Sequence, residues 1–119
     1  NASLVLRMIL DRPGDFAVPE LFLYETYAVL NRFHPDSKTI FDEDIYPLIR
    51  SGVLRYPMTP GIYERAGKYI NLGLTGYDSV YMALAEELDA RWLTYDAKAH
   101  AKVIGEDRSY NLNESNFPP

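Results

Sequence analysis

Cysteine is absent from this chain of 119 residues, and so are long apolar runs. Without cysteine there can be no disulfide bond, zinc ribbon, thiolate nucleophile or haem attached through sulfur. No segment approaches the roughly 20 apolar residues of a membrane-spanning helix. Arg7 interrupts the apolar stretch Ala2–Leu10, which leaves that stretch too short for a signal peptide. These absences fit a reducing compartment, and we expect a cytoplasmic protein.

Positive charge is scarce as well. Lys and Arg number 12 against 17 Asp and Glu, which gives a formal net charge of −5. This balance argues against an extended basic face for duplex DNA. A nucleic-acid ligand would need metal ions or local cations to neutralise its phosphates. The candidate local cations are Arg7, Arg12, Arg32, Lys98 and Lys102.

The remaining composition is that of a globular protein, with 47% hydrophobic and 24% charged residues. The length predicts a single domain over residues 1–119. Short apolar strands alternate with helical segments, which is typical of an α/β fold with a parallel sheet. The predicted strands are Phe16–Val18, Val53–Tyr56 and Arg91–Thr94. The predicted helices are Ala2–Leu10, Pro19–Phe33, Phe41–Arg50 (limited or kinked at Pro47), Thr59–Leu72, Tyr77–Asp89 and Asp96–Val103, and Asn111–Pro119 is predicted to be a loop.

One carboxylate stands where a helix normally buries apolar side chains. On a helix, the neighbours of Glu25 one turn away in each direction are all apolar: Leu21, Phe22, Ala28 and Val29. Burying an unpaired carboxylate costs several kcal/mol. Glu25 is therefore either paired with an arginine from elsewhere or part of a functional site, and we favour the functional interpretation.

Two further acids stand at the starts of predicted helices. Asp78 follows Thr75 at the spacing of a capping box, and Asp96 follows the strand that ends at Thr94. Each could be a capping residue. Taken with Glu25, however, they are the parts of a hard-cation site, because carboxylates that converge repel one another unless a cation such as Mg²⁺ or Mn²⁺ compensates. A pair of such ions can activate water and stabilise a phosphate under attack.

The segments around these acids carry a resemblance. Val18–Glu25, then Leu74–Ala85 with its Tyr-Asp-x-x-Tyr-x-Ala-Leu-Ala run, then Trp92–Asp96 with Leu-Thr-x-Asp, resemble the PIN-domain family and in particular its VapC-type toxins. The likeness extends from Asn1 to about Lys102 in the expected order. It implies a three-layer α/β/α fold with a central parallel sheet, whose first strand would precede Asn1.

The same resemblance implies an activity. In the PIN-domain family, four acids bind Mg²⁺ or Mn²⁺, and the enzyme cleaves RNA internally. Glu25, Asp78 and Asp96 match three of these four positions. Ser3 and Thr94 match hydroxyls beside the metal site. The implied partners are an RNA substrate, an antitoxin protein and a second copy of the chain.

The chain departs from the family pattern at two places. Asn1 aligns with the first acid of an Asp-x-Ser motif, or else with the third position of a motif whose Asp lies two residues upstream. If Asn1 replaces the acid, a catalytically weakened domain that binds RNA or a protein is the alternative function. The stretch Asp11–Ala17 is also abrupt, so either the domain is minimal there or residues are missing from the sequence.

Other chemistry-bearing residues are interpreted as structural. We expect His34 and His100 to lie at the surface, which excludes them as a catalytic pair. Tyrosines recur at helical spacing, and such amphipathic rings are common in oligomer interfaces. They are therefore predicted to serve in the core and in a homodimer interface. The tyrosines at helical spacing are Tyr24, Tyr27, Tyr63, Tyr69, Tyr77 and Tyr81.

Overall fold

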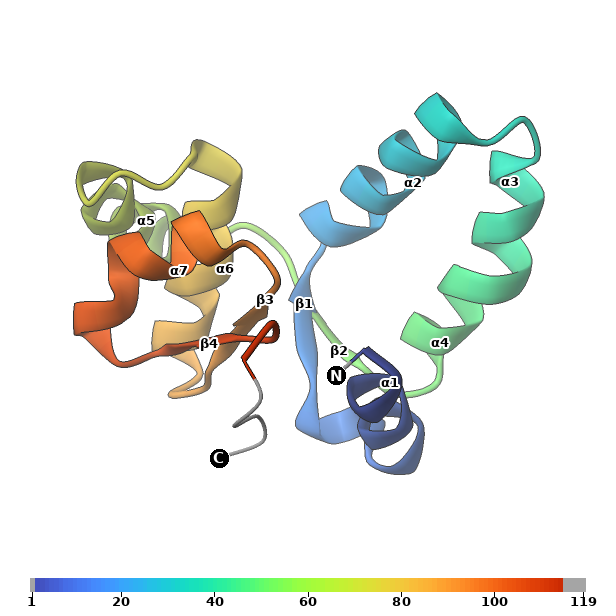
Figure 1. Ribbon diagram of the computed structural model, residues 1–119, viewed down its shortest axis with the longest axis horizontal. Helices are drawn as coiled ribbons and strands as arrows, with labels where there is room; N and C mark the ends of the chain where they lie inside the picture. Colours follow the sequence, from blue (N-terminus) through green and yellow to red (C-terminus); the bar gives the residue numbers. More distant parts are fainter. Residues whose placement is uncertain (1, 115–119) are drawn as a thin grey trace. The chain divides into compact units, whose positions relative to one another are not determined.

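The computed structural model describes residues 2–114, which fall into two compact units. One unit is Ser3–Pro57, and the other comprises the chain from Met58 onward together with Ala2. Each unit contains helices and one pair of short strands (Figure 1). The longest helix has 13 residues, and none in the described ranges has the length and apolar character that a bilayer crossing requires.

The first unit is built around a short parallel strand pair. Val18 of β1 lies opposite Arg55 of β2, and the pairing is extended by Glu20 N, which donates to Tyr56 O at 2.9 Å. Figure 1 shows the two strands side by side. The elements of this unit are α1 (Ala2–Asp11), η1 (Pro13–Asp15), β1 (Ala17–Pro19), α2 (Leu21–Phe33), α3 (Ser37–Ile40), η2 (Phe41–Ile45), α4 (Tyr46–Arg50) and β2 (Leu54–Tyr56).

The helical run after α2 accommodates a proline through a wider turn. Phe41–Ile45 is π-helical, and Tyr46 N donates to Phe41 O, five residues back. Pro47 follows directly and has no N–H to donate to the preceding turn. The irregularity expected at Pro47 is therefore this π turn, and the helix continues beyond it. The ring of Phe41 packs edge-on against Tyr27, with centroids 5.4 Å apart, and stacks on Tyr46.

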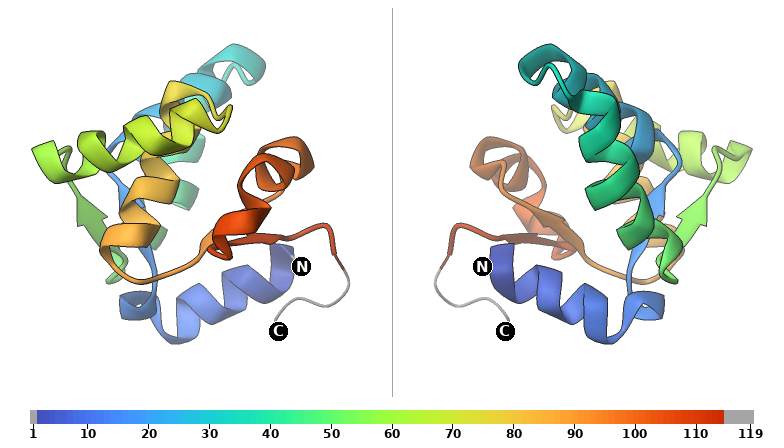
Figure 2. Two further views of the ribbon diagram at one scale, coloured as in Figure 1. Left: turned by 90° about the vertical axis from the view of Figure 1, so that its left-hand side faces the viewer. Right: turned by 90° about the vertical axis from the view of Figure 1, so that its right-hand side faces the viewer.

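The second unit contains the larger buried core. Its elements are α5 (Pro60–Asn71), α6 (Gly76–Glu87), β3 (Trp92–Thr94), α7 (Ala97–Val103), η3 (Ile104–Glu106) and β4 (Ser109–Asn111). Helices α5 and α6 pack against each other, and the left-hand view of Figure 2 shows them in front of the ribbon. Thr59 caps α5 by accepting a bond from Ile62 N, and Pro60 occupies a position where its missing N–H costs nothing. The core cluster consists of Tyr69, Leu74, Met82, Ala85, Trp92, Ala99 and Val103.

The fold class predicted from the sequence is confirmed at the level of α/β architecture with parallel strands. The described strands form two sheets of two strands each, one per unit. One strand was missed: β4 pairs in parallel with β3, so the prediction of a loop from Asn111 was wrong for its first residue. The sequence Ser109-Tyr110-Asn111 has no apolar run, so only its pairing with Trp92–Thr94 makes it a strand.

A buried phenol ties α5 to α6. Tyr69 is 1% exposed, and its hydroxyl donates to Glu86 Oε2 at 3.0 Å. Burial and this hydrogen bond to a carboxylate both raise the pKa of Tyr69 above its ordinary value. A raised pKa means that the folded state favours the neutral phenol. The resulting contribution to stability is complete below the unfolded pKa, near 10, and is lost as the pH rises through the folded pKa.

We predict that Tyr69→Phe lowers the free energy of unfolding by about 1 kcal/mol at about pH 7. The difference from wild type should shrink above about pH 10, because only wild type loses stability as the phenol ionises on unfolding. Urea unfolding followed by the fluorescence of Trp92, which belongs to the same core, measures both. Tyr63→Phe is the matched control, since Tyr63 lies on the same helix but is 61% exposed. A constant difference across this pH range would contradict the assignment.

Candidate active site

The first part of the candidate site lies at the carboxyl end of β3. Thr94 is buried, and its Oγ1 accepts a hydrogen bond from Asp96 N at 3.0 Å. Asp96 is exposed and caps α7, with its Oδ1 accepting from Ala99 N at 2.9 Å. The capping role considered for Asp96 is therefore observed. It engages one carboxylate oxygen and leaves Oδ2 outside the cap.

Strand β4 brings two asparagines to the same edge, which the sequence interpretation missed. Asn111 lies opposite Thr94 in the parallel register, and Leu112 N donates to Thr94 O at 2.8 Å. The side-chain amide of Asn113 donates to Tyr95 O at 2.7 Å. The signal was the Asn-x-Asn spacing, which was interpreted as part of a polar tail.

Asp78 lies in the first turn of α6, where a different residue provides the cap. Thr75 is the N-cap, and its Oγ1 accepts from Asp78 N at 3.1 Å. A reciprocal capping box would add a bond from Thr75 N to the Asp78 carboxylate. Asp78 is partly buried as a residue, and among residues 2–114 no hydrogen bond or ion pair engages its carboxylate. Capping thus accounts for Thr75 and leaves the carboxylate of Asp78 without a structural role.

The starts of α6 and α7 belong to one packed region. Leu74, just before α6, and Ala99, in the first turn of α7, are members of the same core cluster. Lys102 of α7 donates to Gly73 O at 3.1 Å. Gly73 has a φ of +110°, and a Cβ there would lie 3.2 Å from the Lys102 side chain, so glycine suits both the backbone and the contact. The structure therefore places Asp78 and Asp96 at the starts of two helices that contribute to the same core cluster.

The remaining predicted site residues are Glu25 and the amino-terminal residues Asn1 and Ser3. Glu25 lies on α2 in the first unit and is partly buried, as are Leu21 and Phe22 one turn before it. Ser3 is exposed in α1. Asn1 lies outside the described residues. The meeting of Glu25 with Asp78 and Asp96 would join the two units and stays a prediction.

The donor chemistry of the second unit suits a hard cation. Asp78 and Asp96 offer carboxylate oxygens and Thr94 a hydroxyl, which are the donor types that Mg²⁺ and Mn²⁺ prefer. In the described ranges neither acid is neutralised by Lys or Arg, and no group of three or more His, Cys, Asp or Glu is arranged to hold a metal ion. The ion pairs that do form engage Asp15, Glu20, Asp42, Glu86, Asp89, Glu106 and Asp107. Two acids are too few to hold a metal ion by themselves, so binding a cation here would require further ligands in addition to Asp78 and Asp96.

The expectation that His100 lies at the surface was wrong. His100 is 9% exposed, and its Nδ1 lies 2.7 Å from the hydroxyl oxygen of buried Ser109. Helix α7 packs against β4, so the face that carries Ala99, His100 and Val103 turns inward. The histidine links α7 to the first residue of β4. His34 is exposed, as predicted.

We predict that Ser109→Ala lowers the free energy of unfolding by about 1–3 kcal/mol, because it leaves a buried imidazole nitrogen without its partner. Trp92 lies opposite Ser109 in the strand register and reports the transition in urea through its fluorescence. His34→Ala, at the exposed histidine, is the control and should change stability little. Equal effects of the two substitutions would contradict a structural role for the buried pair.

Comparison with known proteins identifies the family of the chain. The model of the PIN domain family matches residues 1–105. No curated protein matches the chain, and no solved structure does so either. The match spans most of the chain and includes Glu25, Asp78, Thr94 and Asp96. The chain therefore belongs to the PIN domain family.

Proposed function

We propose that the chain is a Mg²⁺- or Mn²⁺-dependent endoribonuclease, a hydrolase of phosphodiester bonds. PIN domains are generally nucleases that use divalent metal ions, and PIN nucleases act on RNA. One observation carries the proposal for this chain: Asp78, a partly buried residue in the first turn of α6, has a carboxylate with no hydrogen bond or ion pair among residues 2–114. An acid that neither caps its helix nor pairs with a cation keeps its oxygens for a metal ion.

The proposed roles follow from the donor atoms. Asp78, Asp96 and Glu25 would hold the cation, which when bound supplies Lewis acidity and an activated water for attack on a phosphodiester. Asp96 is held by its own cap to Ala99 N, so its free oxygen is oriented before any ligand binds. Thr94 fixes the backbone at Asp96 and is a positioning residue. Asn1 or an acid upstream of it would complete the ligand set, with Ser3 beside it.

This function implies a finer architecture. Glu25 can join Asp78 and Asp96 only if residues 1–119 act as one domain in which both strand pairs contribute to a single central sheet. The three-layer α/β/α arrangement, with a first strand before Asn1, is therefore part of the proposal. Both observed pairs are parallel, as such a sheet requires.

The biological role proposed is that of a cytoplasmic VapC-type toxin, with an antitoxin protein as its partner and a homodimer as its working form. The support is the resemblance of the three acid-bearing segments, together with exposed tyrosine rings on three helices. Those rings are Tyr24 at 73%, Tyr63 at 61% and Tyr77 at 65% exposure. Exposed aromatic rings of this kind are enriched in protein interfaces.

We predict that Asp78→Asn reduces divalent-ion-dependent RNA cleavage by at least about a hundredfold, since it removes a full charge from a metal ligand. The melting temperature should stay the same or rise, because repulsion between unneutralised acids is relieved. Thr59→Ala is the matched control. It removes the cap of α5, where Thr59 Oγ1 accepts from Ile62 N, so it should cost about 1 kcal/mol of stability and leave cleavage intact.

Cleavage gels with Mg²⁺, Mn²⁺ or excess EDTA, and paired melting curves, distinguish these roles. Wild-type cleavage that survives EDTA would overturn the metal-dependent reaction. Undiminished cleavage by Asp78→Asn would remove this acid from the site. RNA binding by wild type without any cleavage would favour the alternative of a weakened PIN-like binding domain.

We predict that the chain self-associates at micromolar concentration, because burying these rings between two copies removes apolar surface from water. Tyr24→Ser, on the most exposed of the three, should shift sedimentation toward the monomer. A wild-type profile that is monomeric throughout would contradict the homodimer.

A further inference from the structure

Tyr95 places an aromatic ring in solvent at the edge of the candidate site. The ring is 48% exposed, although its neighbour Thr94 is buried and Asp96 is fixed as a helix cap. A single exposed tyrosine is ordinary on a protein surface. What distinguishes Tyr95 is how firmly the backbone that carries it is held.

Three hydrogen bonds immobilise that backbone. Thr94 O accepts from Leu112 N at 2.8 Å, and Asp96 N donates to Thr94 Oγ1 at 3.0 Å. Between them, Tyr95 O accepts from the Asn113 side chain at 2.7 Å. The ring therefore projects from a rigid base and would lose little conformational entropy on binding a ligand.

The amide of Asn113 is itself oriented. Its Nδ2 also donates to Asn111 Oδ1 at 2.9 Å, and its backbone N donates to the same oxygen at 3.0 Å. Two asparagines at the end of β4 thus hold one carbonyl at the end of β3. This network fixes a loop whose one large exposed side chain is Tyr95, which makes it a support for the ring.

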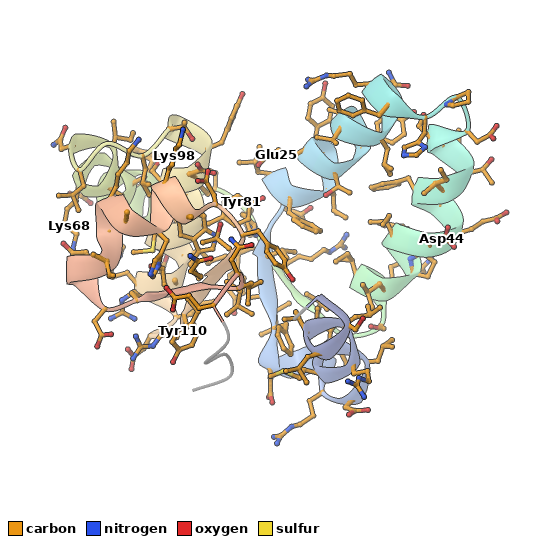
Figure 3. The ribbon with its side chains drawn as sticks, in the orientation of Figure 1. Glu25, Asp44, Lys68, Tyr81, Lys98 and Tyr110 are labelled. Carbon is orange, nitrogen blue, oxygen red and sulfur yellow. The ribbon has the colours of Figure 1, made fainter. Side chains whose placement is uncertain are left out.

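The surroundings indicate the chemistry of the ligand. Asp96, Lys98 and Asn113 are all exposed and polar, so the residues that the fold holds around this loop include polar groups for a ligand. Lys98, labelled on α7 in Figure 3, forms no ion pair in the described part of the chain, whereas Lys102 is engaged with Gly73. An exposed flat ring just before a helix that carries an uncommitted ammonium group matches a nucleotide, which combines an aromatic base with a phosphate.

We propose that Tyr95 stacks on a nucleobase of single-stranded RNA next to the bond that is cleaved, and that Asn113 is the residue that positions it. The proposal deepens, and rests on, the nuclease function. Single-stranded RNA is specified because a base face is open for stacking only when it is not covered by its neighbours in a helix. Stacking on tyrosine tolerates any base, so Tyr95 would contribute affinity and register without reading sequence.

The test measures RNA binding separately from cleavage. The probe is a short fluorescent oligoadenylate, bound in EDTA, together with a series in which one nucleotide at a time is abasic. Tyr95→Leu should weaken binding by about tenfold, the lower range for loss of one base–aromatic stack, whereas Tyr95→Phe should bind as wild type does. Tyr63→Leu is the matched control, since it removes from α5 a ring that is even more exposed than that of Tyr95.

The abasic series separates stacking from a general surface effect. At one position the missing base should weaken wild-type binding by the same factor and leave Tyr95→Leu unaffected, because the contact is already lost. In cleavage, Tyr95→Leu should raise KM with little change in kcat. Asn113→Ala should weaken binding less, and should add nothing in combination with Tyr95→Leu.

Each outcome bears on one proposal or both. Unaltered RNA binding by Tyr95→Leu with normal cleavage overturns the role of Tyr95 and leaves the nuclease function standing. Binding that depends on Tyr95 without cleavage overturns the nuclease function only. Absence of RNA binding by wild type in EDTA and in Mg²⁺ alike, with no cleavage, overturns both. If Tyr95→Leu binds RNA normally and only self-association weakens, the ring belongs to a protein interface and the proposal is wrong.

Discussion

The parallel pairing of β3 with β4 is the constraint on which the rest of the second unit depends. Each strand has three residues, too few to be stable alone. Their pairing places Asn111 beside Thr94 and carries the chain on to Asn113, which holds Tyr95. The buried contact between His100 and Ser109 fixes α7 over the start of β4. The position of Asp96, between β3 and α7, follows from both.

Much of this arrangement could be predicted from local sequence. Thr59-Pro60 and Thr75 specify the starts of α5 and α6 by capping chemistry, and both caps are present. The apolar face of the segment after Tyr77 predicted α6. These signals act over one helical turn, so the sequence suffices to reveal them.

Features that depend on distant partners were not accessible in this way. Strand β4 exists because Ser109-Tyr110-Asn111 lies against β3, since Tyr110 is the one residue of the three that favours a strand. His100 is buried because β4 covers that face of α7, a layer the sequence did not predict. The same contrast between local and long-range features applies to the candidate acids. Local pattern identified Glu25, Asp78 and Asp96, whereas their convergence depends on how distant segments of the chain pack.

Capping and catalysis are compatible in this site because a carboxylate has two oxygens. Asp96 uses Oδ1 to cap α7, which restrains the side chain and leaves Oδ2 for another partner. At α6 the tasks are divided, since Thr75 caps the helix and Asp78 keeps both oxygens. A cap of this kind orients an acid without neutralising it, which an ion pair with lysine or arginine would do.

The distribution of lysine and arginine limits how the chain could attract a polyanion. Most cations in the described ranges are committed to ion pairs, and those outside such pairs are Arg7, Arg32, Arg50, Lys98 and Lys102. With a net charge of −5, long-range attraction cannot supply the affinity of this chain for a polyanion. For the proposed function, affinity would come from short-range contacts: cations held by the acids, Lys98 on α7, and the ring of Tyr95. A site of this kind would require a rigid edge, because contacts that act only at close range lose their value when the groups that make them are misplaced.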